Sequence, residues 1–87
     1  MGNGNELLPG LVLPPAYHGT LRKRLAEIGV ADSAGNCLIA QARAEGLVEA
    51  QETLIHGIVA KHIERLYVLI EDTTMARLAA LQSDAGA

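Results

Sequence analysis

The sequence predicts an all-α protein: a small helical domain with an extended N-terminal arm, two short helices and one long C-terminal amphipathic helix that pairs with a second copy in a dimeric bundle. Three observations support this fold class. After the first 17 residues, apolar residues recur at helical spacing. No segment alternates apolar and polar residues as a half-buried strand does. Nearly half of the 87 residues are apolar, yet Phe and Trp are absent, so the core must consist of Leu, Ile, Val and Ala.

The N-terminal segment is predicted to be an extended arm. Pro9, Pro14 and Pro15 disfavour a helix there, and the stretch LPGLVLPP is typical of a polyproline-like peptide that could bind a partner or a second copy. Residues after the arm have the helical spacing described above, and the last few are polar or small. The chain is therefore divided into an arm at 1–17, a helical domain at 18–82 and a frayed tail at 83–87.

The first short helix is predicted over residues 18–28. Leu21, Leu25 and Ile28 recur at the i, i+4, i+7 spacing of an amphipathic helix. Gly29 is expected to end it, because glycine is common just after the last helical residue.

A second short helix is predicted over residues 34–45. Asp32 or Ser33 can cap its N-terminus by accepting a hydrogen bond from a free backbone N–H group. Gly35 and Gly46 weaken its two ends, because glycine disfavours a helix. Its apolar content is modest, so it should cover little of the core.

The longest predicted element runs from Leu47 to about Gln82. No proline interrupts it, so a helix of about 36 residues and roughly 54 Å is possible. Gly57 and the region of Asp72 are the places where it could bend or divide. The glutamates between residues 45 and 52 would then occupy its first turns, where the helix dipole favours negative charge.

One broad apolar sector lies along this helix when its residues are placed at intervals of about 100°. Two short helices are too small a cover for a sector of this width, and a small core without a disulfide needs further stabilisation. We therefore predict a homodimer built around paired long helices, whose surface also meets a larger protein partner. The predicted interface contains Ile55, Ile58, Val59, His62, Ile63, Leu66, Leu69 and Ile70.

His62 lies near the centre of this apolar sector, and two interpretations of it remain open. It could be a neutral imidazole in the core or interface that makes one hydrogen bond. Alternatively, it could meet its symmetry mate near the dimer axis, where protonation of both rings at acidic pH would bury two like charges and loosen the dimer.

The sequence contains no recognisable enzyme or metal motif. His56 and His62 are six residues apart, so on a helix they point about 240° apart and cannot chelate one ion. Neither Ser33 nor Ser83 lies in a nucleophile elbow. The single cysteine, Cys37, cannot form an internal disulfide, which favours a reducing, cytoplasmic setting, and we expect it to be a small buried hydrophobic residue. We therefore predict no catalytic residue, cofactor or metal.

The charge pattern leaves one candidate site for anions. The net charge of −3 disfavours a protein that coats nucleic acid. However, Arg22, Lys23 and Arg24 form a basic cluster at the predicted start of the first helix, where three cations are electrostatically unfavourable unless an anion is near. Together with Arg43 on the second helix, they are possible contacts for nucleic-acid phosphates.

The sequence favours a non-enzymatic module for protein–protein interaction, such as a regulator, adaptor or inhibitor, that acts as a homo-oligomer. One alternative is a dimeric DNA-binding regulator that uses the basic cluster. Another is a small structural subunit of a larger assembly, which these observations do not separate from the first. No membrane contact is expected, because no apolar stretch approaches the roughly 20 residues that span a bilayer.

Overall fold

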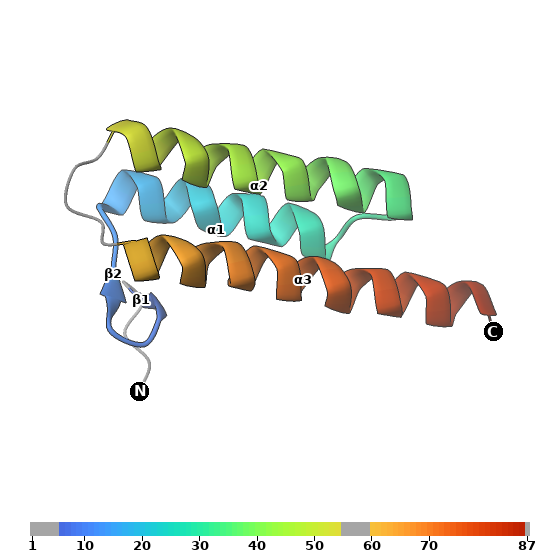
Figure 1. Ribbon diagram of the computed structural model, residues 1–87. Coiled ribbons are helices and arrows are strands. Elements are labelled where there is room, and N and C mark those ends of the chain that lie inside the picture. The colour runs from blue at the N-terminus through green and yellow to red at the C-terminus, as the bar shows by residue number, and fades with distance from the viewer. Residues whose placement is uncertain (1–5, 55–59, 87) are drawn as a thin grey trace.

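The computed structural model contains three helices and one short β-hairpin among the residues it describes, which are 6–54 and 60–86 (Figure 1). The all-α class predicted from the sequence is therefore confirmed for a small domain, and the hairpin is an addition to it. The elements are strands β1 (Glu6–Leu8) and β2 (Leu11–Val12) and helices α1 (Pro15–Gly29), α2 (Ala34–Leu54) and α3 (Ala60–Gly86).

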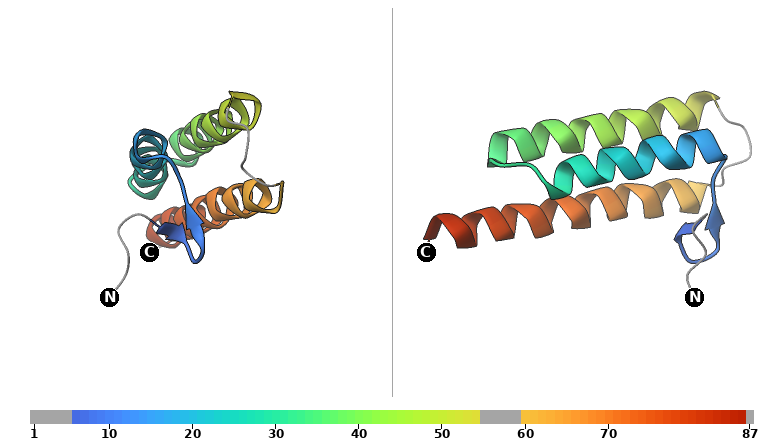
Figure 2. Two further views of the ribbon diagram at one scale, coloured as in Figure 1. Left: turned by 90° about the vertical axis from the view of Figure 1, so that its left-hand side faces the viewer. Right: turned by 180° about the vertical axis from the view of Figure 1, so that it is seen from behind.

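The three helices pack side by side with alternating direction, and α3 extends beyond the C-terminal end of α1 (Figures 1 and 2). Each helix contacts the other two. The hairpin lies at one end of the bundle, beside the start of α3. This arrangement encloses a core between the helices and leaves one outer face on each.

The hairpin replaces part of the predicted arm. Its two strands are antiparallel, with Leu8 opposite Leu11, and Pro9 and Gly10 form the connecting turn. Gly10 has a φ of +78°, the left-handed conformation that the third position of a type II turn requires, and proline favours the position before it. Leu11 and Leu13 are buried, so this segment contributes to the core.

Helix α1 begins at Pro15, three residues before the predicted start. Proline is favourable at the first helical position, because the N–H group that it lacks would have no partner in the helix. The helix ends at Gly29 as predicted. Because of the earlier start, Arg22 to Arg24 lie in the middle of the helix, so the expectation that they crowd its positive end is wrong.

Helix α2 is longer than predicted. The Asn36 backbone N–H donates to Ser33 Oγ over 3.1 Å, which confirms a cap at Ser33. The helix does not end near residue 45 but continues through Gly46 to Leu54. Burial explains the continuation, because Ala44 and Val48 on either side of this glycine are fully buried.

A single uninterrupted helix from Leu47 to about Gln82 is wrong, and the alternative that this stretch divides is correct. Helix α2 ends at Leu54 and α3 begins at Ala60, and Gly57 lies outside the described residues. Helix α3 is continuous through Asp72 and extends to Gly86. The broad apolar sector has the same sequence pattern whether a second copy or the chain itself covers it, and here α3 packs against α1 and α2 of the same chain.

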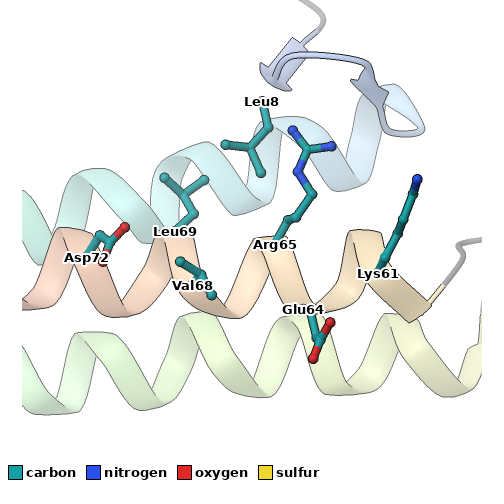
Figure 3. A pocket seen from close by; sticks show the side chains of 7 residues that line it. All are labelled: Leu8, Lys61, Glu64, Arg65, Val68, Leu69 and Asp72. Carbon is teal, nitrogen blue, oxygen red and sulfur yellow. The ribbon is translucent and has the colours of Figure 1, made fainter.

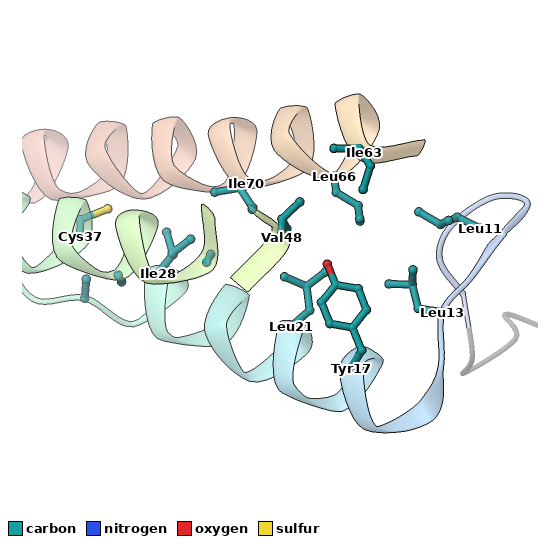
Figure 4. Close-up of a cluster of buried hydrophobic side chains, with 13 residues drawn as sticks. Leu11, Leu13, Tyr17, Leu21, Ile28, Cys37, Val48, Ile63, Leu66 and Ile70 are labelled. Carbon is teal, nitrogen blue, oxygen red and sulfur yellow. The ribbon is translucent and has the colours of Figure 1, made fainter. Parts of the chain in front are cut away.

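The core lies between the three helices and reaches the hairpin (Figure 4). Leu21, Ile28, Leu66 and Ile70 are its largest fully buried apolar side chains. Cys37 is also fully buried, and its Sγ lies 3.9 Å from the carbonyl oxygen of Thr74. This burial confirms the expectation that Cys37 packs as a small hydrophobic residue.

Candidate interaction surfaces

The residues of the predicted dimer interface divide into three groups. Ile63, Leu66 and Ile70 are buried in the core of one chain, so they have no surface left for a second copy. His62 and Leu69 are half-buried. The others lie outside the described residues: Ile55, Ile58 and Val59. Homodimerisation through this sector stays a prediction, and the two interpretations of His62 are untested.

Tyr17 and His18, two buried polar residues at the start of α1, do not stand out in the sequence pattern. The Tyr17 hydroxyl and both ring nitrogens of His18 have no hydrogen-bond partner among the described residues. In Figure 4 the Tyr17 hydroxyl points into the core toward Val48. Burial, and secondly the nearby Tyr67, raises the pKa of Tyr17 to about 12. Burial of His18 could have been predicted from its position three residues before Leu21, which places the two side chains on one side of a helix.

A groove of about 530 Å³ separates the hairpin from α3 (Figure 3). The Arg65 guanidinium donates a hydrogen bond of 2.8 Å to the Pro9 carbonyl oxygen and so joins the two sides of the groove. Leu8, Leu69 and Val68 supply its apolar wall. The remaining lining residues are charged: Lys61, Glu64, Arg65 and Asp72.

An acidic face lies on one side of α2 and α3, around Tyr67. This half-buried tyrosine has a raised pKa, first because of partial burial and then because of the carboxylates of Glu52, Glu49 and Glu45 on α2. These three glutamates therefore lie near a side chain of α3. They occupy the C-terminal half of α2, so the expectation that they begin a helix is wrong, and Glu52 stands in a last turn that favours cations.

Helix α3 adds two more carboxylates to this face. Glu64 lies three residues before Tyr67 and Glu71 four residues after it, which places all three on one side of the helix. Figure 3 shows Glu64 directed toward α2, whereas Lys61 is directed toward the hairpin. We define the acidic face as Glu45, Glu49, Glu52, Glu64, Tyr67 and Glu71.

The far end of the acidic face is apolar. The contact between Cys37 and Thr74 brings one turn of α2 against one turn of α3. Leu38 directly follows Cys37 in the sequence and Met75 directly follows Thr74, and these two residues are 51% and 61% exposed. Leu38 precedes Glu45 by seven residues and therefore lies on the same side of α2.

The predicted anion contacts lie on α1 and α2. Arg22 and Lys23 are exposed, but the Arg24 guanidinium forms a salt bridge of 3.1 Å with Glu27. Arg43 is exposed, and it lines one shallow depression of about 400 Å³ with Glu27. Glu27 therefore places the paired Arg24 near Arg43, whereas Arg22, two residues before Arg24, points about 160° away from it around α1.

Among residues 6–54 and 60–86, no group of three or more His, Cys, Asp or Glu side chains is placed to hold a metal ion. In the same part of the chain, no helix is long and apolar enough to cross a membrane. The chain matches no family model, and neither a curated protein nor a solved structure is detectably similar to it. Function must therefore be inferred from the surfaces themselves.

Proposed function

We propose that this protein is a non-enzymatic helical module for protein–protein interaction, a regulator, adaptor or inhibitor that acts as a homo-oligomer. The apolar side chains left outside the core carry this proposal. Burying a large apolar side chain completely contributes about 1.5–3 kcal/mol, and partial burial against a partner would supply part of that. Five such residues of the described chain are more than half exposed: Val30, Leu38, Ile39, Val68 and Met75.

These residues are grouped in space and therefore support an interaction surface. Single exposed apolar residues, by contrast, are ordinary in soluble proteins. Val30, which directly follows α1, and Ile39 of α2 line the same depression. Val68 and Met75 are seven residues apart and share one side of α3. The groove between the hairpin and α3, with apolar walls and charged edges, offers a larger protein a further place to insert a side chain.

The experiment that tests the homo-oligomer is solution mass by light scattering over a concentration series. The series should reach about 1 mM, where an association of about −4 kcal/mol is half complete. We expect the mass to rise with concentration. We also expect Met75→Ser to weaken the rise, and Ala79→Ser, also exposed and one turn away, to serve as the matched control. A constant monomer mass over the whole series contradicts the proposal.

A DNA-binding regulator remains the second candidate, because Arg22, Lys23 and Arg43 are exposed. If three cations contact phosphates, the logarithm of the binding constant should fall with the logarithm of salt concentration with a slope of about −3. Fluorescence anisotropy of a short labelled duplex measures this slope. Lys23→Glu should weaken binding more than Lys61→Glu, and undetectable binding at low salt eliminates this candidate.

A further inference from the structure

We propose that one copy of this protein docks the outer side of its α1 onto the acidic face of the next copy, in a head-to-tail contact. This inference rests on the proposed homo-oligomer and names the surfaces that form it. The occupant is a second copy because the same chain carries both a carboxylate-rich side and an exposed side of α1 that holds Lys23 at a matching spacing.

The acidic face has an excess of negative charge. The described positions on this side of α2 hold three carboxylates and neither Lys nor Arg, and α3 adds the carboxylates of Glu64 and Glu71, with Lys61 one turn before Glu64. The raised pKa of Tyr67 supports their proximity. A cationic partner would relieve this repulsion, and the exposed Leu38 and Met75 at the far end would supply apolar contacts to the same partner.

The outer side of α1 has the complementary character. Its exposed positions recur at helical spacing along the whole element, and Arg22 is exposed beside them. Alanine and glycine at three of these positions leave the backbone accessible for close packing. Val30 at the end is 75% exposed. The stripe consists of Ala16, Gly19, Lys23, Ala26 and Val30.

The two surfaces also match in register. Lys23 of α1 and Val30, the residue directly after α1 whose N–H still donates to the Ala26 carbonyl oxygen, are seven residues apart. Leu38 and Glu45 are also seven residues apart on α2, and seven residues correspond to about 10.5 Å along a helix. Placing Val30 on Leu38 with the helices antiparallel therefore places Lys23 beside Glu45. The same alignment brings Ala16, in the first turn of α1, beside Glu52 in the last turn of α2.

This alignment is favourable for the helix dipoles. The first turn of α1 carries partial positive charge from its unpaired N–H groups, and the last turn of α2 carries partial negative charge in addition to the carboxylate of Glu52. Because the two surfaces are different parts of one molecule, the contact is heterologous. Repeating it gives a ring if the rotation closes and an open chain if it does not.

Two single charge reversals test the contact. Lys23→Glu removes the cation from the stripe, and Glu45→Lys reverses a charge of the acidic face. Each variant alone should associate at least about tenfold more weakly than the wild type in light scattering at low ionic strength, because like charges then face each other. An equimolar mixture should regain association, because the intact stripe of the Glu45→Lys variant meets the intact acidic face of the Lys23→Glu variant, and the two substituted surfaces also carry opposite charges.

Matched controls lie at the edge of the acidic face, where they meet neither Lys23 nor Glu45 in the alignment. Lys61→Glu and Asp72→Lys change exposed residues of α3 that line the groove beside the hairpin, and they should change the association much less than the two charge reversals do. Circular dichroism of every variant verifies that the helices persist. This contact is wrong, while the homo-oligomer stands, if the two variants associate as strongly as an associating wild type. The same holds if a mixture of the two variants does not regain association. A wild type that stays monomeric overturns both.

Discussion

Tyr17 is the residue whose chemistry departs most clearly from its usual state. Its side chain is 5% exposed, and its hydroxyl has no hydrogen-bond partner among the described residues. Such a buried hydroxyl is a source of instability, because it loses hydrogen bonds to water without gaining others. Ionisation would cost still more, which is why burial raises the pKa of Tyr17 from 10.0 to about 12.

The raised pKa of Tyr17 predicts a loss of stability in alkaline solution. The folded protein binds the phenolic proton more tightly than the unfolded chain does, so this contribution is complete below pH 10 and is lost as the pH rises toward about 12. Urea unfolding at several pH values measures it. Tyr17→Phe should reduce the pH dependence in this window and leave the stability at neutral pH unchanged or raised by about 1 kcal/mol.

Tyr67→Phe provides the comparison for this prediction. Its pKa is also raised, but the residue is only half-buried and its hydroxyl lies beside the glutamates of the acidic face. A spectrophotometric titration of each variant assigns the two ionisations. If Tyr17→Phe keeps the full alkaline loss of stability, burial of that hydroxyl is not its cause.

At the scale of elements, the turn of the hairpin and the middle of α2 each contain an exposed glycine with open space where a Cβ atom would be added. Gly10 has a φ of +78°, so Gly10→Ala should destabilise the protein by about 1–2 kcal/mol. Gly46 lies in a regular helix, so Gly46→Ala should stabilise it by about 0.5–1 kcal/mol.

Chemical denaturation of this pair gives a direct comparison, because both substitutions add the same methyl group to the surface. Opposite signs are expected. Equal effects would mean that the backbone conformation at residue 10 does not contribute to the stability of the folded chain.

The elements with local signals are those that the sequence predicts well. Gly29 ends α1, Ser33 caps α2, and Cys37 lies in the core, because each depends on a residue and its immediate neighbours. The turn at Pro9 and Gly10 also had a local signal, a Pro-Gly pair between apolar residues, but the prolines were interpreted as evidence for an extended arm.

The division between α2 and α3 had only a weak signal, because a single glycine such as Gly57 is compatible with a continuous helix as well as with a break. No proline lies between Leu47 and Gln82, and one helical period continues on both sides of the division. The acidic face was also beyond sequence reasoning, because Tyr67 and Glu45 meet only after the chain folds back on itself. Spacing along one helix shows which residues share a side, but it does not show which other helix covers them.

At the scale of the whole molecule, the bundle buries within one chain the apolar sector that was predicted to need a second copy. Ile63, Leu66 and Ile70 are at most 5% exposed in a single protomer. We therefore expect the fold not to depend on the association that we propose for its surface, in contrast to an obligate dimer, whose subunits have no stable folded state alone.

Stability should accordingly be almost independent of protein concentration. An obligate dimer gains stability with each increase in concentration, whereas a weak surface contact adds only RT ln(1 + [L]/Kd), which is about 0.4 kcal/mol when the free concentration equals Kd. We expect the thermal midpoint measured by circular dichroism to change little between dilute samples and those concentrated enough to associate. The variant Lys23→Glu, which should not associate, provides the reference. A midpoint that falls steeply on dilution for both proteins would show that the core is completed by a second copy.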